Sequence, residues 1–362
     1  MDRRAVGIVF MLTLLPGAAL AQNAGYPTPA EYAERALASE RAPLFQSLDP
    51  LRITLRTDIE WLVDERIDSV EVDGTVTFVD LDGSEASRPV QVRARGEFRR
   101  DRRNCNFPPL RLNFPTGQME GTVFEGEDRL KLVTPCQDNR DDFQRFVYDE
   151  YLAYRVLNLL TPHSFRVRLV EITYEDIEGD YDTRTKNGFL IESDERMAER
   201  NRATYMEVAV LPPRSADGAQ SVVGDVFSYM IGNLDWSTAE FHNAVLVRTE
   251  DGRYVTVPYD FDFSGVVNAR YGTVPEQLAG RVRNVRQRLY RGFCRPELQH
   301  ETVATLFGSK REAVEELYRG FGLYRDPDHG EDALEYYENF WEVIADPREF
   351  EDEILDRCRE MP

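Results

Sequence analysis

Apolar and polar residues alternate through the first part of the chain, from residue 51 to residue 133. A period of two is typical of strands that bury one face of an antiparallel sheet. It predicts five strands, at residues 51–55, 74–80, 90–95, 110–114 and 129–133. The spacing then becomes helical, with apolar residues from Phe143 to Leu157 on one face of a helix that ends before Pro162. Two further strands are predicted at residues 166–174 and 188–192.

The next segment combines a helix with a polar hairpin. Apolar residues within 222–231 follow a helical spacing and lead into the polar stretch 233–243. Short strands are predicted at 244–248 and 254–257, on either side of Asp251-Gly252. This dipeptide favours a two-residue hairpin turn, because both of its residues accept a positive φ.

The order of these elements predicts an α+β protein with two lobes. An antiparallel, sheet-rich first lobe is expected over residues 49–195, and a helix-rich second lobe over residues 196–362. Residues 22–48 contain three prolines around a short alanine-rich stretch and are interpreted as a leader packed on the first lobe. From about residue 274 onwards, aromatic residues at helical spacings predict further helices.

The first residues have the features of a secretory signal peptide. Arg3 and Arg4 precede an apolar run, and Ala19 and Ala21 frame a small-residue cleavage site, which predicts a signal peptide over residues 1–21. The run is shorter than the roughly 20 apolar residues that cross a bilayer. We therefore expect a secreted or periplasmic protein without an integral membrane segment after cleavage.

The chain has four cysteines, which in an exported protein suggest two disulfides. Four cysteines allow three pairings, and we favour the two local pairs, Cys105 with Cys136 and Cys294 with Cys358. Their spacing does not fit a zinc site.

The net charge of −21 argues against nucleic acid and acidic membranes as partners, because both would repel the chain. One basic stretch stands out, containing Arg281, Arg283, Arg286, Arg288, Arg291 and Arg295. It either binds an acidic or phosphorylated partner or forms a solvated helix face paired with neighbouring carboxylates, and we favour the second interpretation.

The hairpin carries the candidate chemistry. In a two-residue turn at Asp251-Gly252, Asn243 lies opposite Asp260 at the open end of the hairpin. Asp235 is brought close by the intervening loop, and Asp262 points to the same side as Asp260 if the strand continues. Such oxygen ligands suit Mg²⁺, so Asn243, Asp260 and Asp262 are predicted metal ligands. A calcium-binding surface loop or an ordinary Asn- and Asp-rich turn is the competing interpretation.

A second constellation comes from the first lobe. Glu150 lies on the apolar face of its helix, where an unpaired carboxylate is costly to bury. Lys131, in the preceding strand, is the expected partner, and Arg95 and Arg155 are alternatives. Kinases pair a strand lysine with a helix glutamate to hold the nucleotide phosphates, while an aspartate orients the acceptor hydroxyl. We assign that last role to Asp235.

Five segments of the chain resemble the CotH-type kinase-like family, named for a spore-coat protein. They are Val92 to Phe98, Pro109 to Phe114, the helix around Tyr148 to Leu160, Gly188 to Glu192, and Asn233 to Asp262 with its Asn-Leu-Asp, His-Asn and Pro-Tyr-Asp-Phe-Asp motifs. The resemblance implies an atypical protein-kinase-like fold with ATP and Mg²⁺ as cofactors. It also implies transfer of phosphate to serine or other hydroxyls of secreted or surface proteins.

The sequence departs from the family pattern in the first lobe. Arg95-Gly96 is followed by an acidic and basic stretch, and Arg111 stands where the family has a lysine. We therefore predict that nucleotide contacts come from Lys131, Glu150, Arg95 and Arg111, with Arg99 as a further phosphate contact.

Three functions fit the sequence. The leading prediction is an exported ATP- and Mg²⁺-dependent phosphotransferase of protein-kinase type with a protein substrate. The alternative is a catalytically inactive kinase-like binding module. A metal-dependent hydrolase is a third interpretation, although the four histidines are not arranged in paired metal-ligand spacings.

Overall fold

The computed structural model describes residues 25–362 except Thr116, Ala209, Ala239 and Pro327. The predicted signal peptide, residues 1–21, lies outside the described residues.

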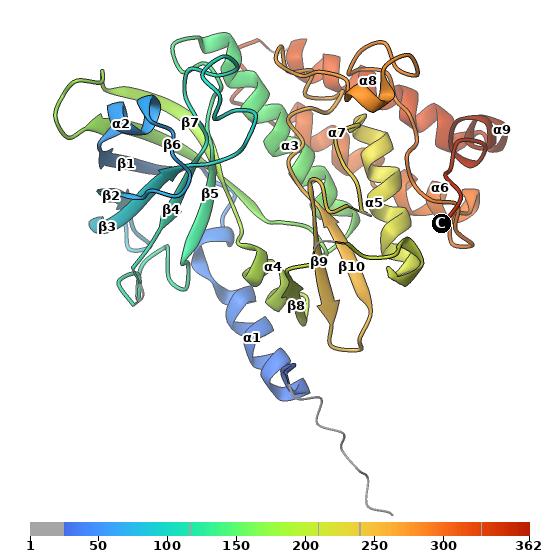
Figure 1. Cartoon of the computed structure of the whole chain (residues 1–362), viewed down its shortest axis with the longest axis horizontal. Coiled ribbons are helices and arrows are strands. Elements are labelled where there is room, and N and C mark those ends of the chain that lie inside the picture. The colour runs from blue at the N-terminus through green and yellow to red at the C-terminus, as the bar shows by residue number, and fades with distance from the viewer. Residues whose placement is uncertain (1–24, 116, 209, 239, 327) are drawn as a thin grey trace, which may run out of the picture.

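Seven strands form a closed barrel in the first part of the chain (Figure 1). The order around the barrel is β1-β2-β3-β4-β5-β7-β6, and all neighbouring pairs are antiparallel except β1 with β6. Each strand overlaps one predicted from the alternation. The bounds are β1 Leu51–Thr57, β2 Val72–Val79, β3 Glu85–Ala94, β4 Leu110–Asn113, β5 Arg129–Val133, β6 Val167–Asp176 and β7 Arg184–Ile191.

The predicted two-lobed, kinase-like fold with an antiparallel sheet is wrong. Strand β6 pairs in parallel with β1 over seven residues, from Leu51 with Val170 to Thr57 with Asp176, and this pairing closes the sheet on itself. Alternation identifies which segments are strands, but it carries no information about which strands pair or in which direction. The closure is therefore a property of the tertiary structure.

The inside of the barrel is filled by the inward-facing side of each strand. On β1, Leu51, Ile53 and Leu55 are buried, while Arg52 and Arg56 on the opposite face are exposed. Phe78, Phe107, Phe114 and Phe124 join this core, which the short helix α2, Ile59–Asp64, helps to cover. Burial of such large side chains is the main source of the barrel's stability.

Helices dominate the rest of the chain and lie to the right of the barrel in Figure 1. A three-stranded sheet of order β10-β9-β8 lies between them and the barrel. The remaining bounds are α3 Gln144–Leu160, α4 Asp194–Arg200, β8 Ala203–Met206, α5 Gly218–Ile231, β9 Ala244–Thr249, β10 Tyr254–Pro258, α6 His300–Gly308, α7 Arg311–Arg319, α8 Asp328–Ala345 and α9 Pro347–Phe350. Short helical turns occur at Pro43–Phe45, Asp141–Phe143, Pro213–Ser215, Glu276–Leu278 and Glu351–Leu355. We call residues 194–362 the helix-rich part.

Helix α3 connects the barrel to the helix-rich part. It follows β5 in the chain and is buried along most of its length, as its apolar spacing predicts. Its side chains share one core with β7 and with the helices α5, α7 and α8. The segment from residue 274 to residue 299 contains only one helical turn, so the prediction of a mostly helical region holds from His300 onwards.

The predicted leader contains an ordered helix, α1, Pro29–Arg41. Its N-terminus is closed by a capping box, in which Thr28 and Glu31 satisfy each other's backbone N–H groups. Tyr32 is 2% exposed and its hydroxyl is 3.0 Å from the Thr204 hydroxyl on β8. The helix is therefore packed against the α4–β8 region.

Both predicted disulfides are confirmed. Cys105 is bonded to Cys136, and Cys294 to Cys358, with Cα atoms 4.7 Å and 5.0 Å apart. Two disulfides are compatible with an extracellular or periplasmic location. Among the described residues, none of the helices combines the length and apolar character that crossing a bilayer requires.

Candidate functional site

Asp235 lies just beyond the end of α5. The helix ends at Gly232, whose φ of 67° is the left-handed conformation typical of a helix C-terminus. A Cβ atom at this position would lie 2.0 Å from the Tyr336 hydroxyl, so both the backbone and the packing require glycine. The Asp235 carboxylate is then fixed by His242 Nε2 at 2.9 Å and by Asn243 Nδ2 at 3.2 Å.

The hairpin register differs from the prediction by one residue. Strand β9 pairs with β10 so that Ala244 is opposite Pro258, and the N–H of Tyr259 donates to Asn243 O at 3.0 Å. Asn243 is therefore opposite Tyr259 and not Asp260. The cause is the turn, because Thr249 and Arg253 close a three-residue loop in place of the predicted two-residue turn.

Asn243 and Asp260 line one cavity despite this shift. Asn243 has a φ of 52° and Asp260 a φ of 64°, both in the left-handed region. Asn and Asp adopt this conformation more readily than other residues with a Cβ atom, although at some energetic cost. The N–H of Asp260 donates to the Tyr154 hydroxyl at 2.8 Å, which holds this conformation against α3.

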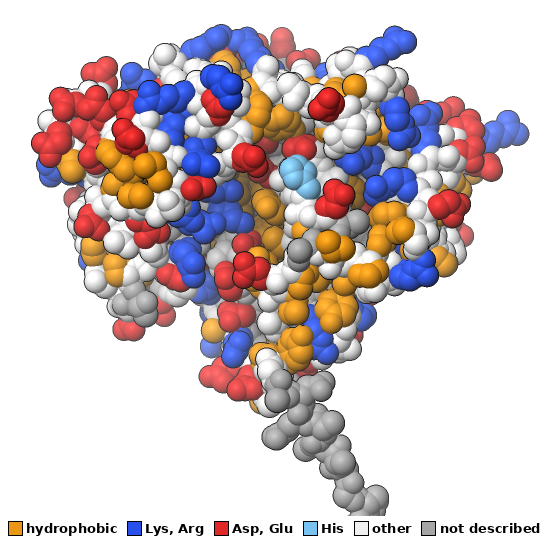
Figure 2. All heavy atoms as spheres, viewed as in Figure 1, with side chains coloured by type: hydrophobic (Ala, Val, Ile, Leu, Met, Phe, Trp, Pro, Cys, Tyr) orange, Lys and Arg blue, Asp and Glu red, His pale blue; other side chains and the backbone are white. Residues whose placement is uncertain are grey.

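One cavity of about 660 Å³ collects the predicted acidic residues. Asp235, Asn243, Asp260 and Asp262 all line it, together with Arg95 from the end of β3. Its other walls come from the loop between β3 and β4, the ends of β5 and β7, and Tyr154 of α3. In Figure 2 the surface between the barrel and the helices is hollowed, and Lys and Arg side chains gather on the barrel side.

A buried charge cluster lies at the base of the cavity. Glu150 is 1% exposed, Asp262 is 4% exposed, and Arg99 has Nη1 3.9 Å from a carboxylate oxygen of each. These separations are too long for hydrogen bonds, and Asp262 Oδ2 has no hydrogen-bond partner. The cluster thus contains a buried carboxylate oxygen whose bonding capacity is unused.

Burial and neighbouring carboxylates raise the pKa of Asp262 and of Glu150. Burial and the nearby Asp260 raise the pKa of Asp262 to about 7, against the opposing effect of Arg99. Burial, together with Asp262 and Asp260, raises the pKa of Glu150 well above its ordinary value. Arg99 is within 4.0 Å of only two of these three carboxylates, so the group is under-neutralised and a cation in the cavity would relieve the repulsion.

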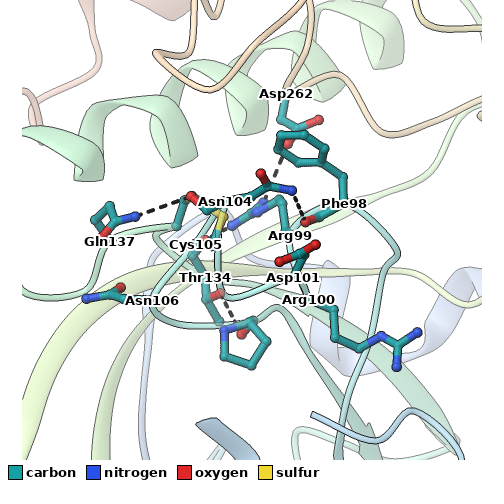
Figure 3. The surroundings of a disulfide bond; sticks show 12 residues. Phe98, Arg99, Arg100, Asp101, Asn104, Cys105, Asn106, Thr134, Gln137 and Asp262 are labelled. Carbon is teal, nitrogen blue, oxygen red and sulfur yellow. Dashed lines mark hydrogen bonds and ion pairs between the residues drawn. A yellow bond between two sulfur atoms is a disulfide. The ribbon is translucent and has the colours of Figure 1, made fainter. Parts of the chain in front are cut away.

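The Cys105–Cys136 disulfide fixes the loop that carries Arg99 (Figure 3). The bond joins the β3–β4 loop to the segment after β5, and Arg99 Nη2 donates to the carbonyl of Thr134 in that segment. Asn104 Nδ2 donates to Phe98 O at 2.9 Å, and Gln137 Nε2 donates to Asn104 O at 3.3 Å. This network involves the stretch after Gly96, where the sequence departs from the CotH-type pattern.

The predicted pairing of Lys131 with Glu150 is not formed. Lys131 Nζ bonds Asp194 Oδ1 at 2.8 Å and lies over the Tyr259 ring at 4.8 Å, while Glu150 is close to Arg99. Lys131 is on the outer face of its strand, and its neighbours in the chain, Leu130 and Leu132, are in the barrel core.

Lys131 belongs instead to a group of cations on the barrel wall. Its strand partner is Arg111 on β4, and the positive charges of Arg95 and Arg111 both lower the pKa of Lys131, in addition to the larger effect of burial. Arg95 lines the cavity, whereas Arg111 and Lys131 lie beside it. Among the described carboxylates, only Asp194 lies within ion-pair distance of any of these cations, and its partner is Lys131. We call Arg95, Arg111 and Lys131 the basic wall.

The donor set fits a hard cation with few protein ligands. In the described part of the chain, no three His, Cys, Asp or Glu side chains are grouped so that they could hold a metal ion by themselves. Mg²⁺ commonly takes one or two carboxylates and keeps its other positions for water and phosphate. The unpartnered Asp262 Oδ2, with Asp260 and the Asn243 amide on the same cavity, is compatible with that mode.

Three residues take roles at the site that the sequence did not predict. Arg99 was expected to contact phosphate, but it lies between Glu150 and Asp262. Tyr154 anchors Asp260, and its position four residues after Glu150 on α3 was the available signal. His242 bonds Asp235, and nothing in its spacing indicated this contact.

Comparison of the chain with protein-family models, with curated proteins and with solved structures finds no match. The resemblance to the CotH-type family therefore stays a prediction.

Proposed function

We propose that this protein is an exported, ATP- and Mg²⁺-dependent phosphotransferase that acts on hydroxyl groups of secreted or surface proteins. The observation that carries the proposal is the cavity in which Asp235, Asn243, Asp260 and Asp262 converge beside Arg95. Its volume of about 660 Å³ is within the range of small-molecule sites, about 300–1,000 Å³.

The opposite charges of the cavity support a nucleotide with its metal. A nucleoside triphosphate with Mg²⁺ presents both phosphate oxygens and a divalent cation to a protein. The basic wall offers three cations, of which only Lys131 is paired with a described carboxylate, and the opposite side offers Glu150 and Asp262, which share one buried arginine. The basic wall is short of negative charge, which the phosphates would supply. The acidic side is short of positive charge, which Mg²⁺ would supply.

The residues take distinct roles in this proposal. Asp260, Asp262 and Asn243 hold Mg²⁺, which neutralises charge on the phosphates. Arg95, Arg111 and Lys131 attract the phosphates, while Glu150 acts through Arg99 and Asp262 to position this part of the site. In the transfer step, a bond forms between the acceptor oxygen and the γ-phosphorus as the bond to the leaving nucleoside diphosphate breaks.

Asp235 receives the proton of the acceptor hydroxyl in this scheme. Its carboxylate is half-buried and already oriented by His242 and Asn243, so little reorganisation is needed before reaction. His242 is a positioning residue here, because its contact is with Asp235 and its own side chain is 58% exposed.

The proposal is tested by following the melting temperature of the mature protein with ATP, with and without Mg²⁺. We expect stabilisation of a few degrees that requires both ligands, because a ligand bound only to the folded state raises its stability. The Asp260→Asn variant is expected to lose the Mg²⁺-dependent part of the shift and the transfer of labelled phosphate to protein hydroxyls.

Two results would contradict the proposal. One is a wild-type protein with no Mg²⁺-dependent response to ATP. The other is an Asp260→Asn variant, folded and with an unchanged circular dichroism spectrum, that transfers phosphate as fast as the wild type.

A binding module without chemistry is the second candidate. It is favoured by the observation that no three described acidic or histidine side chains are grouped to ligate a metal on their own. Such a module would bind its partner at this cavity or nearby, with an affinity independent of ATP and Mg²⁺. The same titration separates the two functions.

A further inference from the structure

The arginines between residues 281 and 295, together with Arg359, are not paired with carboxylates. No described carboxylate lies within 4.0 Å of their guanidinium groups, although the chain carries a net charge of −21. The segment also forms no helix, so the interpretation as a solvated helix face paired with carboxylates is wrong. The group comprises Arg281, Arg283, Arg286, Arg288, Arg291, Arg295 and Arg359.

Arg286, Arg288 and Arg295 are held by contacts within the helix-rich part. Arg288 donates to the carbonyls of Met230 and Tyr336 and lies over the Tyr336 ring, 3.7 Å from its centre. Arg286 lies over the same ring at 4.8 Å. Arg295 donates to Pro213 O at 2.6 Å. These side chains fasten the segment to the helix-rich part.

The remaining arginines lie on or beside the segment that contacts the turn carrying Asp235. Arg281 and Arg283 flank Val282, and the N–H of Arg359 donates to the carbonyl of Gly292, the neighbour of Arg291, at 2.9 Å. The segment is anchored by a small apolar cluster in which Leu278, Val282 and Leu289 pack with Leu234, the residue before Asp235. Arg291 Nη1 donates to the carbonyl of Leu234. The guanidinium of Arg291 is therefore attached to the same turn of chain that carries the Asp235 carboxylate.

Charge accumulates at this position. Burial lowers the pKa of Arg291, the positive charges of Arg359 and Arg281 lower it further, and Asp235 and Glu240 oppose them. Arg281 and Arg283 are exposed, and Arg291 and Arg359 are half-buried. We call these four residues the arginine surface. Figure 2 shows basic side chains on the helix-rich side of the hollow as well as on the barrel side.

We propose that the arginine surface binds a run of aspartate and glutamate residues in the protein that supplies the acceptor hydroxyl. This inference rests on the proposed function, because it places the acidic run next to a hydroxyl at Asp235. Arginine forms charge-assisted, two-point hydrogen bonds with carboxylates, which makes such a group a recognition surface for an acidic segment. An acidic segment also supplies carboxylates at ion-pair distance, which the described chain does not provide to these arginines.

The inference is tested by fluorescence polarisation with a dye-labelled peptide that contains one serine followed by aspartates and glutamates. A matched peptide has asparagine and glutamine in their place, and no nucleotide is added. We expect the acidic peptide to bind at low salt and the neutral peptide to bind at least about tenfold more weakly, with the difference shrinking as salt screens the charges.

The variant Arg281→Glu/Arg283→Glu is expected to weaken binding of the acidic peptide about tenfold or more, because two attractions become repulsions. Both residues are exposed, so folding should be unaffected. The matched control is Arg56→Glu, an exposed arginine on β1 that has no described ion-pair partner and does not line the cavity. This control should bind like the wild type.

Equal binding of the two peptides, or equal weakening by Arg56→Glu, would overturn the inference. A transfer assay with both peptides then separates it from the proposed function. Phosphate transfer to both peptides at equal rates contradicts the arginine surface and leaves the phosphotransferase standing. Selective binding of the acidic peptide without any transfer supports the surface as a docking site and contradicts the phosphotransferase.

Discussion

The two sides of the cavity are built in different ways. The basic wall comes from regular strands, where Arg111 and Lys131 are register partners on the outer face of β4 and β5. The acidic side comes from irregular backbone, where Asp235 follows a helix end and Asn243 and Asp260 have positive φ. On the basic side, regular strands position the cationic side chains. On the acidic side, backbone in the left-handed region positions the polar side chains.

This difference shows how the protein stabilises groups that repel one another. The cations of the basic wall are spread over neighbouring strands, and one carboxylate, Asp194, is paired with Lys131. The buried carboxylates Glu150 and Asp262 have Arg99 between them, in a loop that a disulfide ties to the barrel. Arg99 thus comes from a loop of the barrel, but its side chain lies among the carboxylates of the acidic side.

Removal of the Cys105–Cys136 bond is expected to have the largest effect on the two sides of the cavity. The bond closes a loop between residues 31 apart, and the variant Cys105→Ala/Cys136→Ala should lose about 2–4 kcal/mol of unfolding free energy. Because Arg99 is then less well held, the Mg²⁺-dependent stabilisation by ATP should also fall. Chemical denaturation and thermal-shift titration measure the two effects.

The other disulfide is the matched control for this prediction. The variant Cys294→Ala/Cys358→Ala should also be less stable, but the response to ATP and Mg²⁺ should remain, since Cys294 and Cys358 do not line the cavity. If both double variants lose that response equally, the disulfide has no specific role in placing Arg99.

A comparison of two buried carboxylates, one inside the cavity and one outside it, sharpens the contrast. Asp225 on α5 resembles Asp262, because burial raises its pKa to about 7 and its Oδ1 has no hydrogen-bond partner. It does not line the cavity. Asp225→Asn should therefore leave the Mg²⁺-dependent response to ATP intact, whereas Asp262→Asn should reduce it.

The sign of the pH effect follows from the direction of the shift. The folded state holds the Asp225 proton more tightly than the unfolded chain, whose ordinary pKa is 3.8. The unfolding free energy therefore falls as the pH rises from about 4 to about 7, and the contribution of this group is a few kcal/mol. Asp225→Asn should flatten the stability curve over this range in urea denaturation. A curve as steep as that of the wild type would show that Asp225 is ionised throughout.

The smallest expected effect concerns the basic wall. Arg111→Gln removes one cation beside the cavity and should weaken ATP binding by about five- to tenfold, with a smaller dependence on salt. Isothermal titration calorimetry measures the affinity, and Arg56→Gln on β1 is the control. An unchanged affinity in Arg111→Gln would remove Arg111 from the nucleotide contacts and leave Arg95 and Lys131.

Much of the secondary structure was determined by local sequence pattern. The alternation located all seven barrel strands, and the helical spacing located α3, because both patterns reflect which side of an element is buried. The two disulfides were predicted from cysteine position in the chain. The motif residues Asp235, Asn243, Asp260 and Asp262 were also identified from sequence, and the structure brings them to one cavity.

The tertiary structure decided how these elements combine. Parallel pairing of β1 with β6 closed the barrel and excluded the predicted two-lobed fold, because strand alternation is the same whichever partner a strand has. The three-residue hairpin loop moved the register by one residue, and Asn243 and Asp260, both with positive φ, still line one cavity. The partners of Lys131 and Glu150 were likewise set by which side chains converge in space, and sequence spacing carries no record of that convergence.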